Sequence, residues 1–152
     1  MTSGIKRIFL TPLTANVSTD KENVGTLRFE GNSVYKWVEF SGTTAVVAGD
    51  VVCYVMSSID TEVVVDGANS AVGAGVAMAA AATGAVSYGW IQTEGVATLA
   101  LAFGGTTPTA GETVTTTGAT AGTVTVTAAV TNQVVGVILD VTNKIMSCSF
   151  PH

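Results

Sequence analysis

The chain has 152 residues, a formal net charge of -5 and a hydrophobic share of 47%, while only 11% of its residues are charged. Soluble proteins carry about 25% charged residues, so this surface is poor in charge and we expect a partner to cover part of it. The six basic residues are too few and too scattered to follow a phosphate backbone, which excludes nucleic acid as a partner.

Two windows without charge, residues 67–93 and 113–139, raise the question of a membrane span. Both consist mainly of Ala, Gly, Thr, Ser and Val with frequent glycines, whereas a spanning helix needs about 20 predominantly apolar residues. The first ten residues also lack the apolar core and the cleavage site of a secretory signal. We therefore expect no membrane partner and synthesis in the cytoplasm.

Residues 1–23 are expected to form an N-terminal arm. An apolar cluster with two basic residues inside it opens this segment: Ile5, Lys6, Arg7, Ile8, Phe9 and Leu10. Thr11-Pro12 ends the cluster, and the chain is then largely polar up to Asn23. Two interpretations fit, a frayed terminus or first edge strand, and an extended arm that adds a strand to the sheet of a neighbour.

From Val24 onward, short alternating segments are separated by turn residues about every 8–12 positions, which is typical of an all-β sandwich or barrel. The fold is expected to be all-β, a compact antiparallel β-sandwich or barrel, with residues 24–152 as a single domain. Glu94-Gly95 is expected to turn the chain between two strands. The segments expected as strands are 24–30, 34–40, 51–56, 63–65, 77–82 (running into a loop), 87–93, 96–101, 112–117, 123–127, 133–141 and 144–150.

Two short sequence motifs each occur twice in the chain. Ala48–Val52 (AGDVV) is matched by Ala110–Val114 (AGETV), and Gly75–Met78 (GVAM) is matched by Gly136–Leu139 (GVIL). The intervals between their glycines are 26 residues (75 − 49) and 25 residues (136 − 111). The pattern indicates two similar small β units, roughly 45–101 and 107–150, bridged by a hairpin at Trp90. A chance match in a chain rich in Val, Ala and Gly is the alternative.

Residues able to run a reaction are few. His152 is the only histidine and the last residue, where no second shell can hold it, so histidine triads and metal sites are excluded. Cys53 and Cys148 each stand alone in a strand-like segment and are expected to be buried and inert. The alternative is a disulfide between them, which requires that their two strands adjoin. We expect no enzyme activity, no metal and no cofactor.

The acidic residues offer no clear catalytic or metal-binding pattern. Asp50 and Glu112 occupy matching positions that suit a carboxylate pair, but an acid after glycine at a strand entry is typical of turns. Asp60, Glu62 and Asp66 lack the spacing of a calcium-binding loop, so solvated loop acids are expected there.

Four aromatic residues lie in two strand-like segments. Tyr35 and Trp37 share one face of their strand, and Tyr88 and Trp90 share one face of theirs. Such rings suit a platform on which sugars stack. They suit a hydrophobic core equally well, because each ring can bury about 150–250 Å².

The chain resembles the head decoration (capsid cement) proteins of phages. The phrases that carry the resemblance are Ala48–Val52, Gly75–Ala80, Ala110–Glu112 and Val135–Leu139, together with Tyr88–Gly95, which is similar to phage structural β proteins. In the second copy of the pattern a glutamate stands where the family has an aspartate, and Asp-Val follows where the family has an Ala pair.

The resemblance covers roughly residues 24–150 and implies a structural virion protein. It implies binding to the major capsid protein on the outer surface of an icosahedral capsid, which stabilises the expanded shell. It also implies a homo-oligomer, with a trimer favoured and a dimer also compatible. Residues 5–10 are then expected to contact the capsid, so deletion of residues 1–12 should abolish shell binding and leave the fold intact. The main alternative is a carbohydrate- or receptor-binding β module of a phage head or tail fibre.

Overall fold

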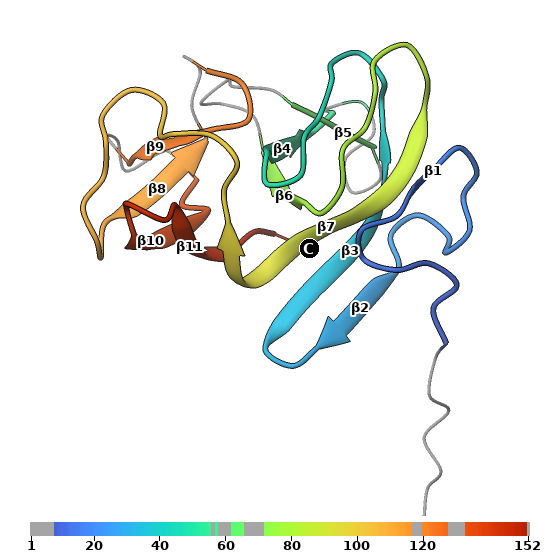
Figure 1. Cartoon of the computed structure of the whole chain (residues 1–152), viewed down its shortest axis with the longest axis horizontal. Helices are drawn as coiled ribbons and strands as arrows, with labels where there is room; N and C mark the ends of the chain where they lie inside the picture. The colour runs from blue at the N-terminus through green and yellow to red at the C-terminus, as the bar shows by residue number, and fades with distance from the viewer. Residues whose placement is uncertain are drawn as a thin grey trace, which may run out of the picture.

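The computed structural model describes residues 8–55, 57, 62–65, 72–116, 120–127 and 133–151. In these ranges the chain forms β-strands and no helix (Figure 1), which confirms the predicted all-β fold. The strands, in chain order, are β1 (Asn16–Val17), β2 (Leu27–Glu30), β3 (Ser33–Phe40), β4 (Val51–Tyr54), β5 (Glu62–Val64), β6 (Gly73–Ala77), β7 (Ser87–Thr98), β8 (Thr113–Thr116), β9 (Val124–Val126), β10 (Gly136–Asp140) and β11 (Ile145–Ser149).

Five of these strands, in the order β3, β5, β4, β6 and β7, form a closed barrel, and the other six pack outside it. The ring closes because β7 pairs with β6 on one side and with β3 on the other. Its pairings are antiparallel except β3–β5, where Glu39 lies opposite Glu62 in a parallel register. A ring with an odd number of strands cannot alternate in direction all the way round. The expectation of a wholly antiparallel barrel is therefore wrong at this pair.

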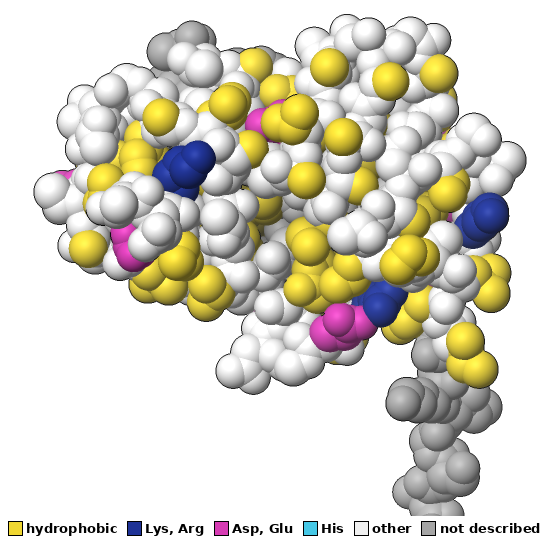
Figure 2. All heavy atoms as spheres, viewed as in Figure 1, with side chains coloured by type: hydrophobic (Ala, Val, Ile, Leu, Met, Phe, Trp, Pro, Cys, Tyr) yellow, Lys and Arg dark blue, Asp and Glu magenta, His cyan; other side chains and the backbone are white. Residues whose placement is uncertain are grey.

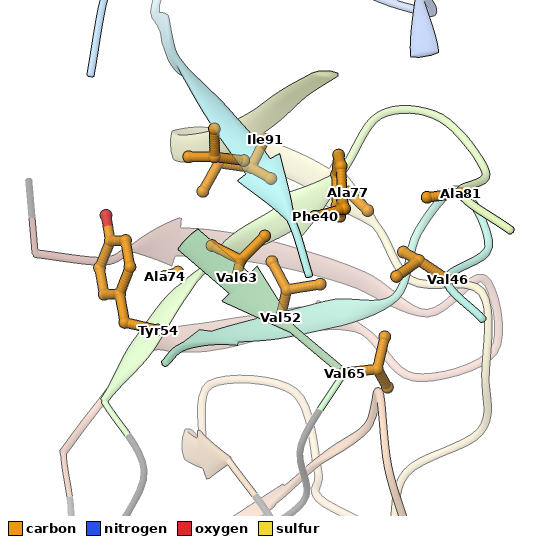
Figure 3. Close-up of a cluster of buried hydrophobic side chains, with 11 residues drawn as sticks. Phe40, Val46, Val52, Tyr54, Val63, Val65, Ala74, Ala77, Ala81 and Ile91 are labelled. Carbon is orange, nitrogen blue, oxygen red and sulfur yellow. The ribbon is translucent and has the colours of Figure 1, made fainter. Parts of the chain in front are cut away.

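The barrel is filled by side chains from all five of its strands (Figure 3). Phe40, Val52, Val63 and Ile91 are almost fully buried there, as alternation along each strand requires of the inward positions. Three small residues of the same cluster, Ala74, Ala77 and Ala81, fill the remaining space. The Ala-rich segment 74–81 thus allows close packing of the barrel interior.

Strand β7 is the longest, with 12 residues, and runs across the molecule from the barrel to the β8–β11 side (Figure 1). The predicted turn at Glu94-Gly95 is therefore wrong. Gly95 does have the positive φ of a turn residue, 100°, but the chain only bends there. The buried Gln92 amide braces the bend, since its Nε2 donates to the carbonyl oxygens of Glu94 and Val96, both at 3.1 Å.

The strands β8–β11 repeat the pairing pattern of β4–β7. Val52 of β4 lies opposite Gly75 of β6, and Val114 of β8 lies opposite Gly136 of β10. On one side of these pairs, β4 also pairs with β5, and β8 also pairs with β9. On the other side, β6 pairs with β7, and β10 pairs with β11, again antiparallel. Both glycines are required by close approach, because an added Cβ would lie 2.8 Å or 2.6 Å from a carbonyl oxygen of the next strand.

The turn before β4 is also repeated before β8. The Gly49 N–H donates to the Ala77 carbonyl at 2.8 Å, and the Gly111 N–H donates to the Ile138 carbonyl at the same distance. The acidic residue after each glycine accepts the backbone N–H of the residue three positions before it. The two AG-acid phrases therefore have the same local geometry, as their shared turn chemistry predicts.

Residues 94–98 of β7 take the place in this pattern that β3 has in the barrel. Tyr35 of β3 lies opposite Gln92, and Val96 lies opposite Ser147 in the same way.

We call β3–β6 with residues 87–93 the first unit, and residues 94–98 with β8–β11 the second unit. The predicted ranges 45–101 and 107–150 place all of β7 in one unit, whereas the matched pairings divide it near Glu94. Core positions that correspond are Val38 and Leu99, Val52 and Val114, Val63 and Val124, Ala74 and Val135, Ala77 and Ile138, and Ile91 and Met146.

Candidate binding surfaces

The described part of the predicted arm lies against the body of the protein. β1 pairs with β7, with Val17 opposite Tyr88, so this segment adds a strand to the sheet of its own chain. Phe9, Leu13, Val17 and Val24 pack onto the outer side of the first unit. We call residues 8–24 the strap. Ile5, Lys6 and Arg7 lie outside the described residues.

Buried polar contacts fasten the strap. The Glu22 carboxylate is buried and accepts hydrogen bonds from the backbone N–H and the hydroxyl of Thr11, at 2.7 and 2.8 Å. The Thr11 hydroxyl in turn accepts from the Trp90 indole at 3.0 Å, and Asp20 accepts from the Trp37 indole at 2.9 Å. Sequence reasoning missed these acceptors. The signal for them is that a buried indole N–H needs an acceptor, and a polar segment next to two tryptophans can supply it.

The proposed sugar platform is wrong for the two tryptophans. Trp37 and Trp90 are fully buried and pack edge to face, with ring centroids 5.1 Å apart. Phe9 of the strap packs edge to face on Trp90 at 5.4 Å. These side chains point away from the barrel interior, and the strap covers them, so they form a third hydrophobic cluster, in line with the alternative of core aromatics.

The two tyrosines lie at the margins of this cluster. Tyr35 is buried, and Tyr88 is half-buried. The Tyr88 hydroxyl donates to the Glu39 carboxylate, and this hydrogen bond is the main cause that raises the Tyr88 pKa. The four aromatic residues predicted as a surface therefore form no exposed stacking plane.

Large exposed hydrophobic side chains gather at the start of the strap. Ile8 is 83% exposed and Leu10 is 73% exposed, while Phe9 between them faces the body. Phe29 on β2 is also exposed, and the guanidinium of its neighbour Arg28 lies 4.9 Å from the centre of the Phe9 ring. We call Ile8 and Leu10 the N-terminal patch. Hydrophobic side chains are visible beside the start of the strap in Figure 2.

The acids predicted as turn residues differ in burial. Asp50 is buried, its Oδ2 accepts the Val47 N–H at 2.8 Å, and its Oδ1 has no hydrogen-bond partner. Burial raises the pKa of this carboxyl group. An added Cβ on Gly122 would lie 3.0 Å from that Oδ1, so the chain of the second unit closes over Asp50. Glu112 at the matching turn is only half-buried.

Both cysteines are buried and free, as predicted. The Cys148 thiol donates to the Gly95 carbonyl at 3.1 Å. Burial raises the Cys148 pKa to about 12, and the charge of Glu94 adds to the rise. A thiol in this state is a poor nucleophile, because the thiolate is the reactive form.

A hollow of about 410 Å³ lies where the two units meet. It is lined by residues of β3, β6 and β7 and by the turn before β4, among them Tyr35, Met78, Gln92 and Val96. This lining carries no acidic or basic side chain. The hollow can therefore accept an apolar or hydrogen-bonding group, but it offers no acid–base pair for catalysis.

Among the described residues, no group of three or more His, Cys, Asp or Glu side chains is placed to hold a metal ion. Asp60, Asp66 and His152 lie outside the described residues. The same part of the chain contains no helix long and apolar enough to cross a membrane. Comparisons with family models, with characterised proteins and with solved structures find no match.

Proposed function

We propose that this chain is a decoration protein that binds the outer surface of an icosahedral phage capsid and stabilises the expanded shell. The observation that carries the proposal is the N-terminal patch. Ile8 and Leu10 are the most exposed large hydrophobic side chains of the described residues. They stand at one end of a tightly packed β body with little surface charge. Exposed apolar side chains in this setting mark a surface that a partner covers.

The structure offers a physical route from this patch to a stabilising function. A subunit that binds only the assembled, expanded shell stabilises it by RT ln(1 + [L]/Kd), which is about 2.7 kcal/mol per site at 100 times Kd. Many copies on one shell multiply the effect. Such a protein needs a rigid body and a contact surface. The closed barrel and the N-terminal patch are suited to these two roles, with the major capsid protein as the partner.

Deletion of residues 1–12 is a poor test of this contact, contrary to the expectation from sequence. It would remove Thr11, and with it the hydrogen bonds to Glu22 and Trp90 that fasten the strap. Loss of binding would then follow from local unfolding as easily as from loss of contact. Substitution of the two exposed side chains leaves Phe9 and Thr11 in place and is the sharper test.

The experiment is co-sedimentation with expanded shells on a sucrose gradient. The wild-type chain should migrate with the shells in fixed proportion to the major capsid protein. The double variant Ile8→Ser/Leu10→Ser should stay in the slow fractions, and Val86→Ser, which changes an exposed valine before β7, should migrate like wild type. Recovery of the wild-type chain only in slow fractions would refute the proposal. Binding on glycan arrays would then be measured.

A further inference from the structure

The hollow between the two units is lined by a buried amide whose orientation is fixed. Gln92 lines the hollow and is only 4% exposed. Its Nε2 donates to the carbonyl oxygens of Glu94 and Val96. Because a carbonyl oxygen only accepts hydrogen bonds, these two contacts determine which end of the amide is nitrogen. They therefore also fix the position of Oε1.

The Gln92 Oε1 atom is an acceptor that the chain leaves unused. It accepts no hydrogen bond from the described residues, and it is not one of the buried side-chain atoms without a partner, so solvent reaches it. The hydroxyl of Tyr35, on the opposite strand, is in the same state. Both side chains are at least nine-tenths buried and line the hollow, so their accessible polar atoms face that space.

The rest of the lining is mainly apolar and carries no charge. Val76, Ala77 and Ala97 are buried there, and the half-buried Met78 contributes a thioether, whose sulfur makes favourable contacts with aromatic rings. A charged ligand would lose its hydration without gaining a partner of opposite charge. The volume of about 410 Å³ lies within the range of about 300–1,000 Å³ that is typical of small-molecule sites.

Two other apolar surfaces of the described residues are less suited to a small ligand. A second hollow, of about 210 Å³, is lined by Asn16 and Ser87, but these two side chains hydrogen-bond to each other at 3.0 Å. Ile8 and Leu10 of the N-terminal patch are strongly exposed and do not enclose a space. The larger hollow is the place where apolar walls and accessible polar atoms occur together.

We propose that this hollow is a binding site for a neutral aromatic molecule that carries an N–H or O–H donor, such as an indole or a phenol. The ring lies against Met78 and the apolar lining, and its N–H or O–H donates to Gln92 Oε1. The Tyr35 hydroxyl is available to a further polar group on the ring, because a hydroxyl both donates and accepts. This inference does not rest on the proposed function, since the hollow and the N-terminal patch share no residue.

The test is an NMR titration of the isotope-labelled full chain with indole and 1-methylindole as matched probes. Indole should shift the side-chain amide signals of Gln92 and the methyl signal of Met78, with a dissociation constant of about 1 mM or lower. 1-Methylindole keeps the ring but has lost the N–H donor, so it should bind about 3- to 10-fold more weakly. Indole-3-acetate adds a carboxylate and should give no saturable shift at the same concentrations.

Ala48→Phe tests the location of the site. Ala48 is an exposed residue of the lining, so a larger side chain fills the hollow from its rim and leaves Gln92 unchanged. This variant should lose the indole-induced shifts. Val47→Phe is the matched control, because Val47 is the exposed neighbour in the same turn and does not line the hollow. It should bind indole like the wild type, and the amide spectrum of each variant reports whether it is folded.

Two results with the wild-type chain would overturn the inference: no saturable shift of Gln92 and Met78 with indole, or equal affinity for indole and 1-methylindole. Full indole binding by a folded Ala48→Phe variant would also overturn it, because the ligand would then lie elsewhere. If Ala48→Phe does not fold, the comparison of the two probes on the wild-type chain decides.

Discussion

The bend in β7 is the feature that joins the two units, and Gly95→Ala is the substitution that tests its importance. Gly95 has φ of 100°, a conformation that a residue with a Cβ rarely adopts. The added methyl group would lie 2.5 Å from the Ser33 hydroxyl oxygen and 2.9 Å from the Asn32 carbonyl oxygen. The second of these is a backbone atom of the β2–β3 turn, which cannot move without shifting the strands.

The expected cost follows from these two effects. A left-handed conformation costs a non-glycine residue about 1–2 kcal/mol, and forcing a methyl group into a packed site costs about 1–3 kcal/mol. The free energy of unfolding should therefore fall by about 2–5 kcal/mol, a large part of the 5–15 kcal/mol typical of a domain. With a urea m-value of about 2 kcal/mol/M, the unfolding midpoint should drop by about 1–2.5 M.

Gly25→Ala separates the two effects. Gly25 has φ of 89°, but an added Cβ there meets no atom within 4 Å. This variant should lose only the conformational part, about 1–2 kcal/mol. Urea unfolding followed by tryptophan fluorescence measures both variants. If Gly95→Ala and Gly25→Ala lose the same stability, the close packing at the bend is not what fixes β7, and the reasoning fails.

Three further predictions concern buried groups. Trp90→Phe removes the donor to the Thr11 hydroxyl at 3.0 Å, so urea unfolding should show a loss of about 1–3 kcal/mol and limited proteolysis should cut the strap faster. Burial raises the pKa of Asp50 above 3.8. At pH values between 3.8 and this raised pKa, the folded protein holds a proton that the unfolded chain has lost, so the free energy of unfolding falls as the pH rises. Asp50→Asn should abolish this fall and Glu112→Gln should keep it, in urea midpoints measured against pH. The Cys148 thiol, with its pKa near 12, should stay unreactive towards a disulfide reagent at about pH 8 until the chain is unfolded.

Local chemistry predicted from sequence is accurate where neighbouring residues decide the conformation. The turns at Gly49 and Gly111 follow from an AG-acid phrase, and both glycines have the expected positive φ, 93° and 91°. The same reasoning failed at Gly95, where a positive φ bends a strand instead of reversing it. The outcome there depends on Gln92, whose amide bridges the bend. A contact of that kind is fixed by the folded strand and leaves no separate signal in the sequence.

The aromatic residues show a second limit of sequence reasoning. Alternation places Tyr35 and Trp37 on one face of their strand, but it does not reveal which side that face is on or whether a third layer covers it. The covering comes from the strap, a largely polar segment whose Thr11 and Glu22 look like loop residues in isolation. Their role depends on burial created by contacts distant in sequence, since Thr11 and Trp90 are 79 positions apart.

The two units explain why one end of the molecule is sealed and the other open. In the first unit, large indoles point outward from β3 and β7, and their N–H groups find acceptors in Thr11 and Asp20. Without the strap, those indoles would expose a wide apolar surface. In the second unit, the smaller Val96 and Thr98 stand at the positions of Tyr35 and Trp37, so leaving them in water costs less. The chain therefore covers the face that most needs covering with its own N-terminal segment, and the other face stays exposed.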